Sequence, residues 1–275
     1  MPELPETETI ARDLNRAISG ARITSVDVER ADVLREVNAR QLAKRVAGVV
    51  IDRAWRRAKL VVLDLSSGDR LVVQPRFTGA LLIDDGSLSP ELREYSTMHF
   101  TLDDGRLLHY RDVRRLGTVA LMTPMRFDEY TSALGIEPLD PAFTGTHLSV
   151  LLRGSRQAIK KVLMDQRALA GVGNIYANEA LWRAGIDPSR AADRVDADET
   201  IALRDAIVDV LNESIALRGT SFRDYRDASG ERGGFVERLQ AYGREGQPCA
   251  RCGRRLIGTH AIDGRTTVLC ANCQK

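Results

Sequence analysis

The first half of the chain alternates short apolar runs with turn residues. The runs are rich in β-branched residues and are punctuated by Ser67-Gly68 and Asp104-Gly105, which predicts antiparallel strands joined by tight turns. We expect strands at residues 23–28, 46–51, 60–65, 71–73 and 80–83. Ahead of them, Ile10, Leu14 and Ile18 recur at spacing four, which predicts a helix over residues 5–19. The first domain is therefore expected to be a β-sandwich or barrel-like domain with a leading helix.

The second half has helical periodicity instead. We expect helices at residues 147–153, 157–165, 175–184 and 198–217. Residues 135–145 contain two prolines and two glycines, which is typical of a linker. The expected division is a β-sandwich domain at 1–134, a linker at 135–146, a helical domain at 147–240 and a cysteine-bearing finger at 241–275. The fold class is thus α+β with two domains.

Composition and charge add constraints on the kind of protein. The net charge is only +2, but residues 241–275 hold six cations against two carboxylates. Further basic clusters are Arg53, Arg56, Arg57 and Lys59, and then Arg111, Arg114 and Arg115. Clustered cations suit a polyanionic partner, although each cluster alone is equally compatible with a solvated basic face. The chain has no apolar run of about 18 residues and starts with acidic rather than basic residues, so we expect a cytoplasmic protein without a membrane span or secretory signal.

All four cysteines lie in the last 27 residues. They form two Cys-x-x-Cys knuckles, Cys249/Cys252 and Cys270/Cys273, separated by seventeen residues. This spacing predicts one tetrahedral, structural Zn²⁺ site. Two disulfides are the alternative, but the other 248 residues lack cysteine and no export signal precedes them, which disfavours disulfides.

Between the knuckles, two strand-like runs at residues 256–261 and 266–269 flank Asp263-Gly264. Asp-Gly favours a tight hairpin turn, so Arg265 is expected at the tip of a metal-anchored β-hairpin. An arginine on a rigid tip suits contact with a phosphate or a nucleic-acid groove. Because so small a segment cannot fold on its own core, metal binding is expected to supply its stability.

The chain begins Met1-Pro2-Glu3. If Met1 is removed, the first group is the secondary amine of Pro2. An α-amine titrates near pH 8 and a lysine near pH 10.4, so the α-amine is neutral far more often at pH 7. A secondary amine joined to a sugar C1′ gives a cationic iminium, which promotes elimination of phosphate, and Glu3 could protonate the departing base. The alternative is structural, with Pro2 opening an element and Glu3 favouring the helix dipole.

Together, these features resemble the formamidopyrimidine-DNA glycosylase and endonuclease VIII family over essentially the whole chain. The resemblance assigns Pro2 as nucleophile, Glu3 as general acid, Glu6 as a second acidic position and Lys59 as a contact to phosphate and the sugar of the lesion. Residues 166–179 resemble the helix-two-turn-helix of the family, with Asn174 as its phosphate-binding asparagine, and a glycine-rich turn before a helix suits phosphate. Tyr242-Gly-Arg244 and the fingertip Arg265 complete the resemblance, with Arg244 and Arg265 contacting DNA and Arg265 also counted among the catalytic residues.

Two motifs depart from the usual family pattern. His-Leu-Gly-Met-Ser/Thr-Gly is replaced by Gln74-Pro-Arg-Phe77-Thr-Gly79, and Asp-Pro-Arg-Arg-Phe-Gly by Asp112-Val-Arg114-Arg115-Leu116-Gly117. In the family these segments fill the space left by an extruded nucleotide, so Phe77, Arg114 and Leu116 are expected to form this wedge beside the cationic Arg115. Without the resemblance, Phe77 and Leu116 would be taken for core residues.

The resemblance implies a bifunctional DNA glycosylase and AP lyase of base excision repair, acting through a Pro2 Schiff base and β,δ-elimination. Its partner would be double-stranded DNA with oxidised bases or abasic sites, and the enzyme would be a monomer with nucleoid-associated activity. Residues 218–235 resemble the lesion-capping loop of the family, which favours oxidised purines such as 8-oxoguanine. The alternatives are an oxidised-pyrimidine glycosylase of the endonuclease VIII type and a non-catalytic binder of damaged DNA.

Overall fold

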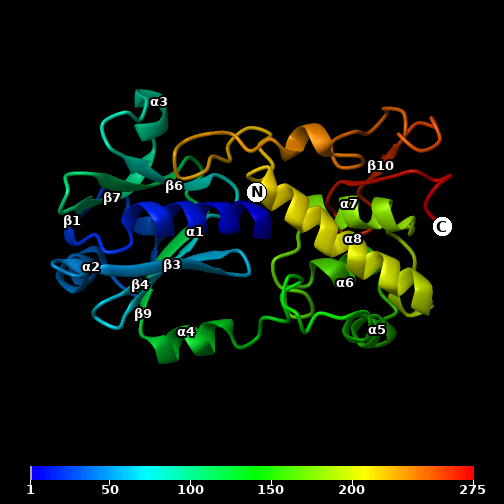
Figure 1. Ribbon diagram of the computed structural model, residues 1–275, viewed down its shortest axis with the longest axis horizontal. Helices are drawn as coiled ribbons and strands as arrows, with labels where there is room; N and C mark the ends of the chain where they lie inside the picture. The colour runs from blue at the N-terminus through cyan, green and yellow to red at the C-terminus, as the bar shows by residue number, and fades with distance from the viewer. Residues whose placement is uncertain (1) are drawn as a thin grey trace. The chain divides into compact units, whose positions relative to one another are not determined.

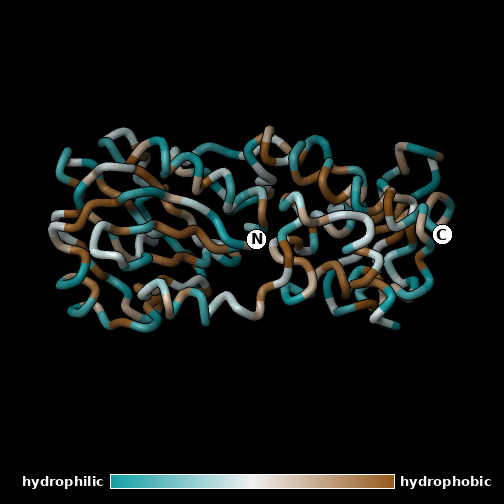
Figure 2. Tube along the Cα trace, turned by 60° about the horizontal axis from the view of Figure 1, so that its bottom comes forward, coloured by the Kyte–Doolittle hydropathy of each residue, from teal (hydrophilic) through white to brown (hydrophobic). Residues whose placement is uncertain are grey.

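The computed structural model describes residues 2–275, which fold into two compact units (Figure 1). The first unit contains the chain up to Ser132 together with residues 215–236, and the second contains residues 133–214 and 237–275. Met1 lies outside the described residues, so the expectation that it is removed is not addressed by the structure. Figure 2 shows hydrophobic stretches alternating with hydrophilic ones along the chain in both units.

Within residues 2–132, the first unit contains two mostly antiparallel sheets and four α-helices. Its helices are α1 (Leu4–Ile18), α2 (Ala39–Val46), α3 (Pro90–Arg93) and α4 (Pro124–Thr131). The four-stranded sheet has the order β1 (Ile23–Val28), β7 (Ser96–Leu102), β8 (Leu107–Asp112), β6 (Gly79–Asp84). The five-stranded sheet has the order β2 (Leu34–Arg35), β9 (Thr118–Met122), β5 (Arg70–Gln74), β4 (Leu60–Leu65), β3 (Ile51–Arg57).

One hydrophobic core joins the inner faces of these two sheets. Alternate residues of β7 and β8, such as Phe100 and Tyr110, meet alternate residues of β4 and β5, such as Leu63 and Leu71. Successive strand residues point to opposite faces, so each strand contributes every second side chain to this core. The spacing-four apolar residues of α1 pack into the same core. The predicted sandwich with a leading helix is confirmed.

The strand expected at residues 46–51 is wrong in its position. Val46 is instead the last residue of α2, where it is buried one turn after Leu42. Asn38 caps this helix, since its side chain accepts from the backbone N–H of Gln41 and the Gln41 side chain accepts in return. Val46 at the end of α2 is followed at once by further apolar residues. In sequence, the end of the helix and the segment before the next strand therefore look like one strand. The strand itself, β3, starts at Ile51.

The second unit is helical apart from its finger. It contains α5 (Gly145–Arg153), α6 (Ile159–Met164), α7 (Asn174–Ala184) and α8 (Ala197–Ala216), followed by the hairpin strands β10 (Ile257–Thr259) and β11 (Thr267–Leu269). The helical domain and the β-hairpin finger were both predicted, and the α+β class is confirmed. Across residues 2–275, no helix is long and apolar enough to cross a membrane.

After α8 the chain returns to the first unit. Residues 215–236, which the sequence placed within the helical domain, pack against α1 and β6 instead. The backbone N–H of Ile83 donates to the carbonyl of Ala228 at 2.8 Å, and Tyr225 and Ala228 belong to the core of the sandwich. The local sequence of this stretch is polar and rich in glycine, so its place in the first unit follows from tertiary contacts and not from its own pattern.

Candidate active site and metal centre

Pro2 and Glu3 lie directly before α1, and both are buried. Glu3 is the N-cap of the helix, with Pro5 in the first turn. The side chain of Glu6 accepts a hydrogen bond from the backbone N–H of Glu3 at 2.8 Å, and the Glu3 side chain accepts from the backbone of Glu6. This reciprocal capping box fixes the backbone on which Pro2 and Glu3 stand.

Lys59 belongs to the two-residue turn between β3 and β4. The turn is closed by the register pair Arg57 and Leu60, and Ala58 adopts a left-handed φ of 52°, which is unfavourable for a residue with a side chain. The hydroxyl of Thr7 in α1 donates to the carbonyl of Ala58 at 3.4 Å. The structure therefore brings the turn that carries Lys59 against the first turn of α1, as a site built from Pro2, Glu3 and Lys59 requires.

The two segments that depart from the family pattern are joined by a buried aspartate. Asp112 is 1% exposed. Its carboxylate accepts from the Thr78 hydroxyl and from the backbone N–H of Gly117 at 2.8 Å, while the backbone N–H of Arg114 donates to the Thr78 hydroxyl at 3.0 Å. Thr78 comes from the first segment and the other residues from the second, so the two segments form one rigid structure.

Phe77 and Leu116 project from these segments rather than entering the core. They are 44% and 41% exposed, and each follows an arginine with positive φ, Arg76 at 53° and Arg115 at 50°. Such strain is tolerated where the surroundings over-determine the backbone, often at functional sites. The reading of Phe77 and Leu116 as core residues is wrong, and their exposure leaves the wedge role open to them.

Arg114 and Arg115 differ in their surroundings. The guanidinium of Arg114 lies over the ring of Phe77, so it is part of the projecting surface. Arg115 forms an ion pair with Asp32 at 3.0 Å, and both side chains are about half exposed. An exposed pair of this kind is worth about 1 kcal/mol or less, so a phosphate could replace Asp32 at little cost.

Asn174 opens α7 and contacts the fingertip loop of residues 260–266. Its side-chain amide donates to the carbonyl of Thr266 at 3.0 Å, next to Arg265, whose side chain is exposed. The finger is not the tight two-residue hairpin that Asp-Gly suggested, because β10 ends at Thr259 and β11 starts at Thr267. The backbone N–H of Gly264 closes the loop on the carbonyl of His260 at 2.9 Å.

Sequence reasoning missed a lysine that supports this loop. Lys160 of α6 is fully buried; its ammonium donates to the hydroxyl of Thr267 at 2.7 Å and lies 3.7 Å from a carboxylate oxygen of Asp263. The available signal was a lysine between the apolar residues of a short helix, since a buried lysine is almost always paired.

The approach to the finger is held by a buried carboxylate and by Arg244. Glu179 of α7 accepts from the backbone N–H groups of Gln240, Ala241 and Tyr242 at 2.8–2.9 Å. The Arg244 guanidinium donates to the carbonyl of Leu239 at 3.2 Å. Burial, opposed by these backbone hydrogen bonds, raises the pKa of Glu179. Arg244 therefore takes part in the local structure and stays a candidate DNA contact through its remaining donors.

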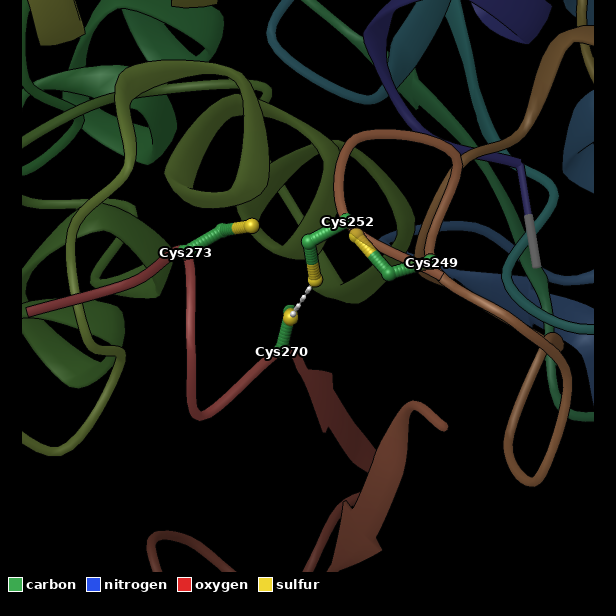
Figure 3. A group of neighbouring side chains, drawn as sticks. All are labelled: Cys249, Cys252, Cys270 and Cys273. Carbon is green, nitrogen blue, oxygen red and sulfur yellow. Dashed lines mark hydrogen bonds between the residues drawn. The ribbon is translucent and has the colours of Figure 1, made fainter. Parts of the chain in front are cut away.

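The four cysteines converge at the base of the finger (Figure 3). Their sulfur atoms all lie within 4.8 Å of one another, and those of Cys252 and Cys270 are 3.5 Å apart. Four thiolates about 2.3 Å from one Zn²⁺ would be separated by about 3.8 Å, whereas a disulfide needs about 2.05 Å. The residues present therefore fit a structural zinc.

The thiol of Cys249 is also prepared for ionisation. Burial opposes the thiolate of Cys249, but hydrogen bonds from the backbone N–H groups of Arg251 and Cys252 outweigh it and lower its pKa to about 6. Thiolates, not thiols, are the metal ligands. The expectation of one structural zinc is confirmed by this geometry together with the zinc finger family that residues 246–275 match.

Comparison with known proteins extends over the whole chain. The formamidopyrimidine-DNA glycosylase N-terminal domain matches residues 1–119, the H2TH domain of the same enzymes matches residues 134–226, and the zinc finger found in FPG and IleRS matches residues 246–275. A formamidopyrimidine-DNA glycosylase from Xanthomonas campestris pv. campestris (strain B100) is 42% identical over 276 residues, which is 100% of both chains.

Solved structures agree with the sequence relatives. Fpg (MutM) of Lactococcus lactis in complex with DNA containing N7-benzyl-Fapy-dG matches with a TM-score of 0.91 at 31% identity, covering 100% of both chains. MutM (Fpg) from Thermus thermophilus matches with a TM-score of 0.87 at 34% identity, covering 99% of this chain and 98% of that one.

Proposed function

Because the chain belongs to the formamidopyrimidine-DNA glycosylase family, we propose that it is a bifunctional DNA glycosylase and AP lyase of base excision repair. Its substrates are duplexes with oxidised purines, such as formamidopyrimidines and 8-oxoguanine, and abasic sites. The observation that carries the proposal is the buried Pro2-Glu3 pair at the capped start of α1, with the Lys59 turn packed against the same helical turn.

In the proposed reaction, the neutral amine of processed Pro2 attacks C1′ of the damaged nucleotide. The bond from C1′ to the base breaks, and the base leaves with a proton from Glu3. Ring opening gives an iminium between the Pro2 nitrogen and C1′, whose positive charge acidifies C2′. Loss of a C2′ proton expels the 3′ phosphate, a second elimination expels the 5′ phosphate, and hydrolysis frees Pro2. Lys59 stabilises the phosphate and sugar oxygens.

The target base must leave the stack before Pro2 can reach C1′, which costs a few kcal/mol. Phe77, Arg114 and Leu116 fill the space that it leaves, and Arg115 exchanges its ion pair with Asp32 for a phosphate.

The second unit holds the DNA backbone. Asn174, Arg244 and Arg265 contact phosphates, with Arg265 on the fingertip loop supported by Lys160. Zn²⁺, held by Cys249, Cys252, Cys270 and Cys273, keeps the finger folded.

Borohydride trapping tests the proposal. The reductant converts the iminium into a stable amine, so processed enzyme should become covalently linked to duplexes with 8-oxoguanine, a formamidopyrimidine or an abasic site. Intact mass should show Met1 removed from the active sample. A variant with one extra residue before Pro2 is the matched control, because its proline nitrogen is an amide, and it should give no adduct. Absence of any adduct from the processed chain would overturn the proposal.

The same assay separates the substrate classes. The loop of residues 218–235 favours oxidised purines as substrates, and the Lactococcus lactis relative binds DNA that contains a formamidopyrimidine nucleotide. Faster trapping on oxidised thymine than on 8-oxoguanine would instead favour an enzyme of the endonuclease VIII type. DNA binding without trapping on any lesion would favour a non-catalytic binder.

We also propose that the enzyme acts as a monomer on nucleoid DNA. Each chain carries its own nucleophile, general acid and finger, so the chemistry needs no second copy. Light scattering during gel filtration should give a mass close to 30.4 kDa for the free protein, and imaging of a tagged chain should show it over the nucleoid.

A further inference from the structure

One carboxylate joins two parts of the first unit that are far apart in sequence. Glu6 is 1% exposed. One of its oxygens accepts from the backbone N–H of Glu3 at 2.8 Å, and the other accepts from the backbone N–H of Thr220, 214 residues later, also at 2.8 Å. Glu3 is the proposed acid, and Thr220 lies at the start of the loop formed by residues 218–235.

Close packing holds the loop against Glu6. Gly219 has a φ of +84°, and a Cβ atom there would lie 3.0 Å from Cγ of Glu6 and 3.0 Å from Cε1 of Tyr225. Tyr225 is 4% exposed, and its hydroxyl donates to the carbonyls of Arg218 at 3.1 Å and Glu6 at 3.4 Å. Any side chain at position 219 would therefore push the loop away from the carboxylate.

A second set of contacts fixes the base of the loop to the same helix. The guanidinium of Arg218 donates to Asp13 of α1 and to Asp227, both at 2.5 Å. Asp227 is 1% exposed and also accepts from the backbone N–H of Glu231 at 2.9 Å. Residues 222–224, in contrast, form an exposed bend, in which Phe222 is 44% exposed. The base of the loop is thus rigid, whereas this bend faces solvent.

We propose that Glu6 is a positioning residue that couples this loop to Glu3. The inference rests on the proposed function and deepens it. Thr220, at the rigid base of the loop that holds the damaged base, positions the Glu6 carboxylate, and the carboxylate positions the backbone of Glu3. The acid is placed to protonate a departing base only while this bridge is intact. Base excision therefore depends on this bridge, whereas elimination at a preformed abasic site, which has no base to hold or protonate, does not.

Glutamine at position 6 breaks the bridge with little change in volume. A carboxylate presents an acceptor to both N–H groups, but an amide presents one acceptor and one NH₂ group. One of the two backbone N–H groups must then face a donor. Misplacement of a catalytic group by about 1 Å can cost about 100-fold in rate.

The experiment compares two activities of full-length, processed protein under single-turnover conditions. One is base excision from an 8-oxoguanine duplex, and the other is strand cleavage at a preformed abasic site. Glu6→Gln should lower base excision by about 100-fold and leave abasic-site cleavage within about 3-fold of wild type. Gly219→Ala, which changes the loop residue of this contact instead of the helix residue, should likewise lower base excision and spare abasic-site cleavage. The double variant should be no worse than the poorer single variant, because both break one coupling.

Glu8→Gln is the matched control. Glu8 lies on the same helix and pairs with Arg12 and Arg56, but it contacts neither Glu3 nor the loop, so both activities should persist. Equal losses of both activities in Glu6→Gln would indicate a merely structural cap and overturn the coupling. Unchanged base excision in Glu6→Gln, or additive effects in the double variant, would also overturn it. If Glu6→Gln does not fold, the ratio of base excision to abasic-site cleavage in Gly219→Ala tests the coupling. A wild-type chain that cleaves neither duplex would overturn the proposed function itself.

Discussion

The guanidinium carbon of Arg114 lies 5.1 Å from the centroid of the Phe77 ring. A guanidinium over an aromatic face keeps its N–H donors at its edges, where they can still bind an acceptor. The two residues come from different segments, which Asp112 and Thr78 hold together. The stacked pair is therefore assembled before any DNA arrives.

If this stack orients Arg114 toward the base opposite the lesion, Phe77 should affect selectivity. Phe77→Leu keeps apolar bulk but removes the ring face, and it should reduce the preference among opposite bases by about 2-fold to 5-fold, which corresponds to about 0.5–1 kcal/mol for an exposed cation–π contact. Phe77→Trp should retain the preference. The measurement is kcat/KM with the lesion opposite each of the four bases. Wild-type selectivity in Phe77→Leu would rule out the orienting role.

Arg265 should contribute to affinity through phosphate. Arg265→Ala is expected to weaken duplex binding and to reduce the slope of log affinity against log salt by about 0.9 for each lost phosphate contact. Arg265→Lys keeps the charge and should keep most of the slope. Titrations at several salt concentrations measure both quantities. Identical slopes for wild type and Arg265→Ala would contradict a phosphate contact.

Removal of zinc should unfold the finger without unfolding the sandwich. Metal analysis should give one zinc per chain, and a strong chelator should abolish DNA binding, because metal coordination supplies roughly 10 kcal/mol or more to such segments. Trp182 packs with Cys249 and Cys270, so its fluorescence should change on chelation. Substantially less than one zinc per chain in active protein, or DNA binding that survives complete zinc removal, would refute the structural role.

His109 should make stability depend on pH. Burial, and then the neighbouring His99, lower the pKa of His109 below 6.5. As the pH falls, the unfolded chain protonates His109 near pH 6.5, before the folded protein does. The contribution of His109 to folding stability is therefore fully present above about pH 6.5 and is lost as the pH falls through its lower pKa in the folded protein. Denaturant midpoints should therefore fall below pH 6.5 in wild type. His109→Gln should show a smaller fall over the same range, and an unchanged fall would assign the effect to other groups.

Local patterns in the sequence were enough for the elements whose stability is local. The spacing of Ile10, Leu14 and Ile18 identified α1, and the two Cys-x-x-Cys knuckles identified the metal centre, because both depend on neighbours within a few residues or on ligand spacing. Helix α2 was not predicted, and a strand was expected at residues 46–51 instead, because the apolar end of α2 runs directly into the apolar residues before β3 and periodicity cannot divide so short a run.

The sequence by itself thus determined the fold class, the zinc cluster and the order of the candidate residues from Pro2 to Arg265. Only the tertiary structure decided that Thr220 meets Glu6, that Lys160 supports the fingertip loop, and that Arg114 stacks on Phe77. Each of these contacts joins different segments of the chain. The physical reason is that such hydrogen bonds and ring contacts depend on how packed elements meet in space, which the periodicity of any one segment does not encode.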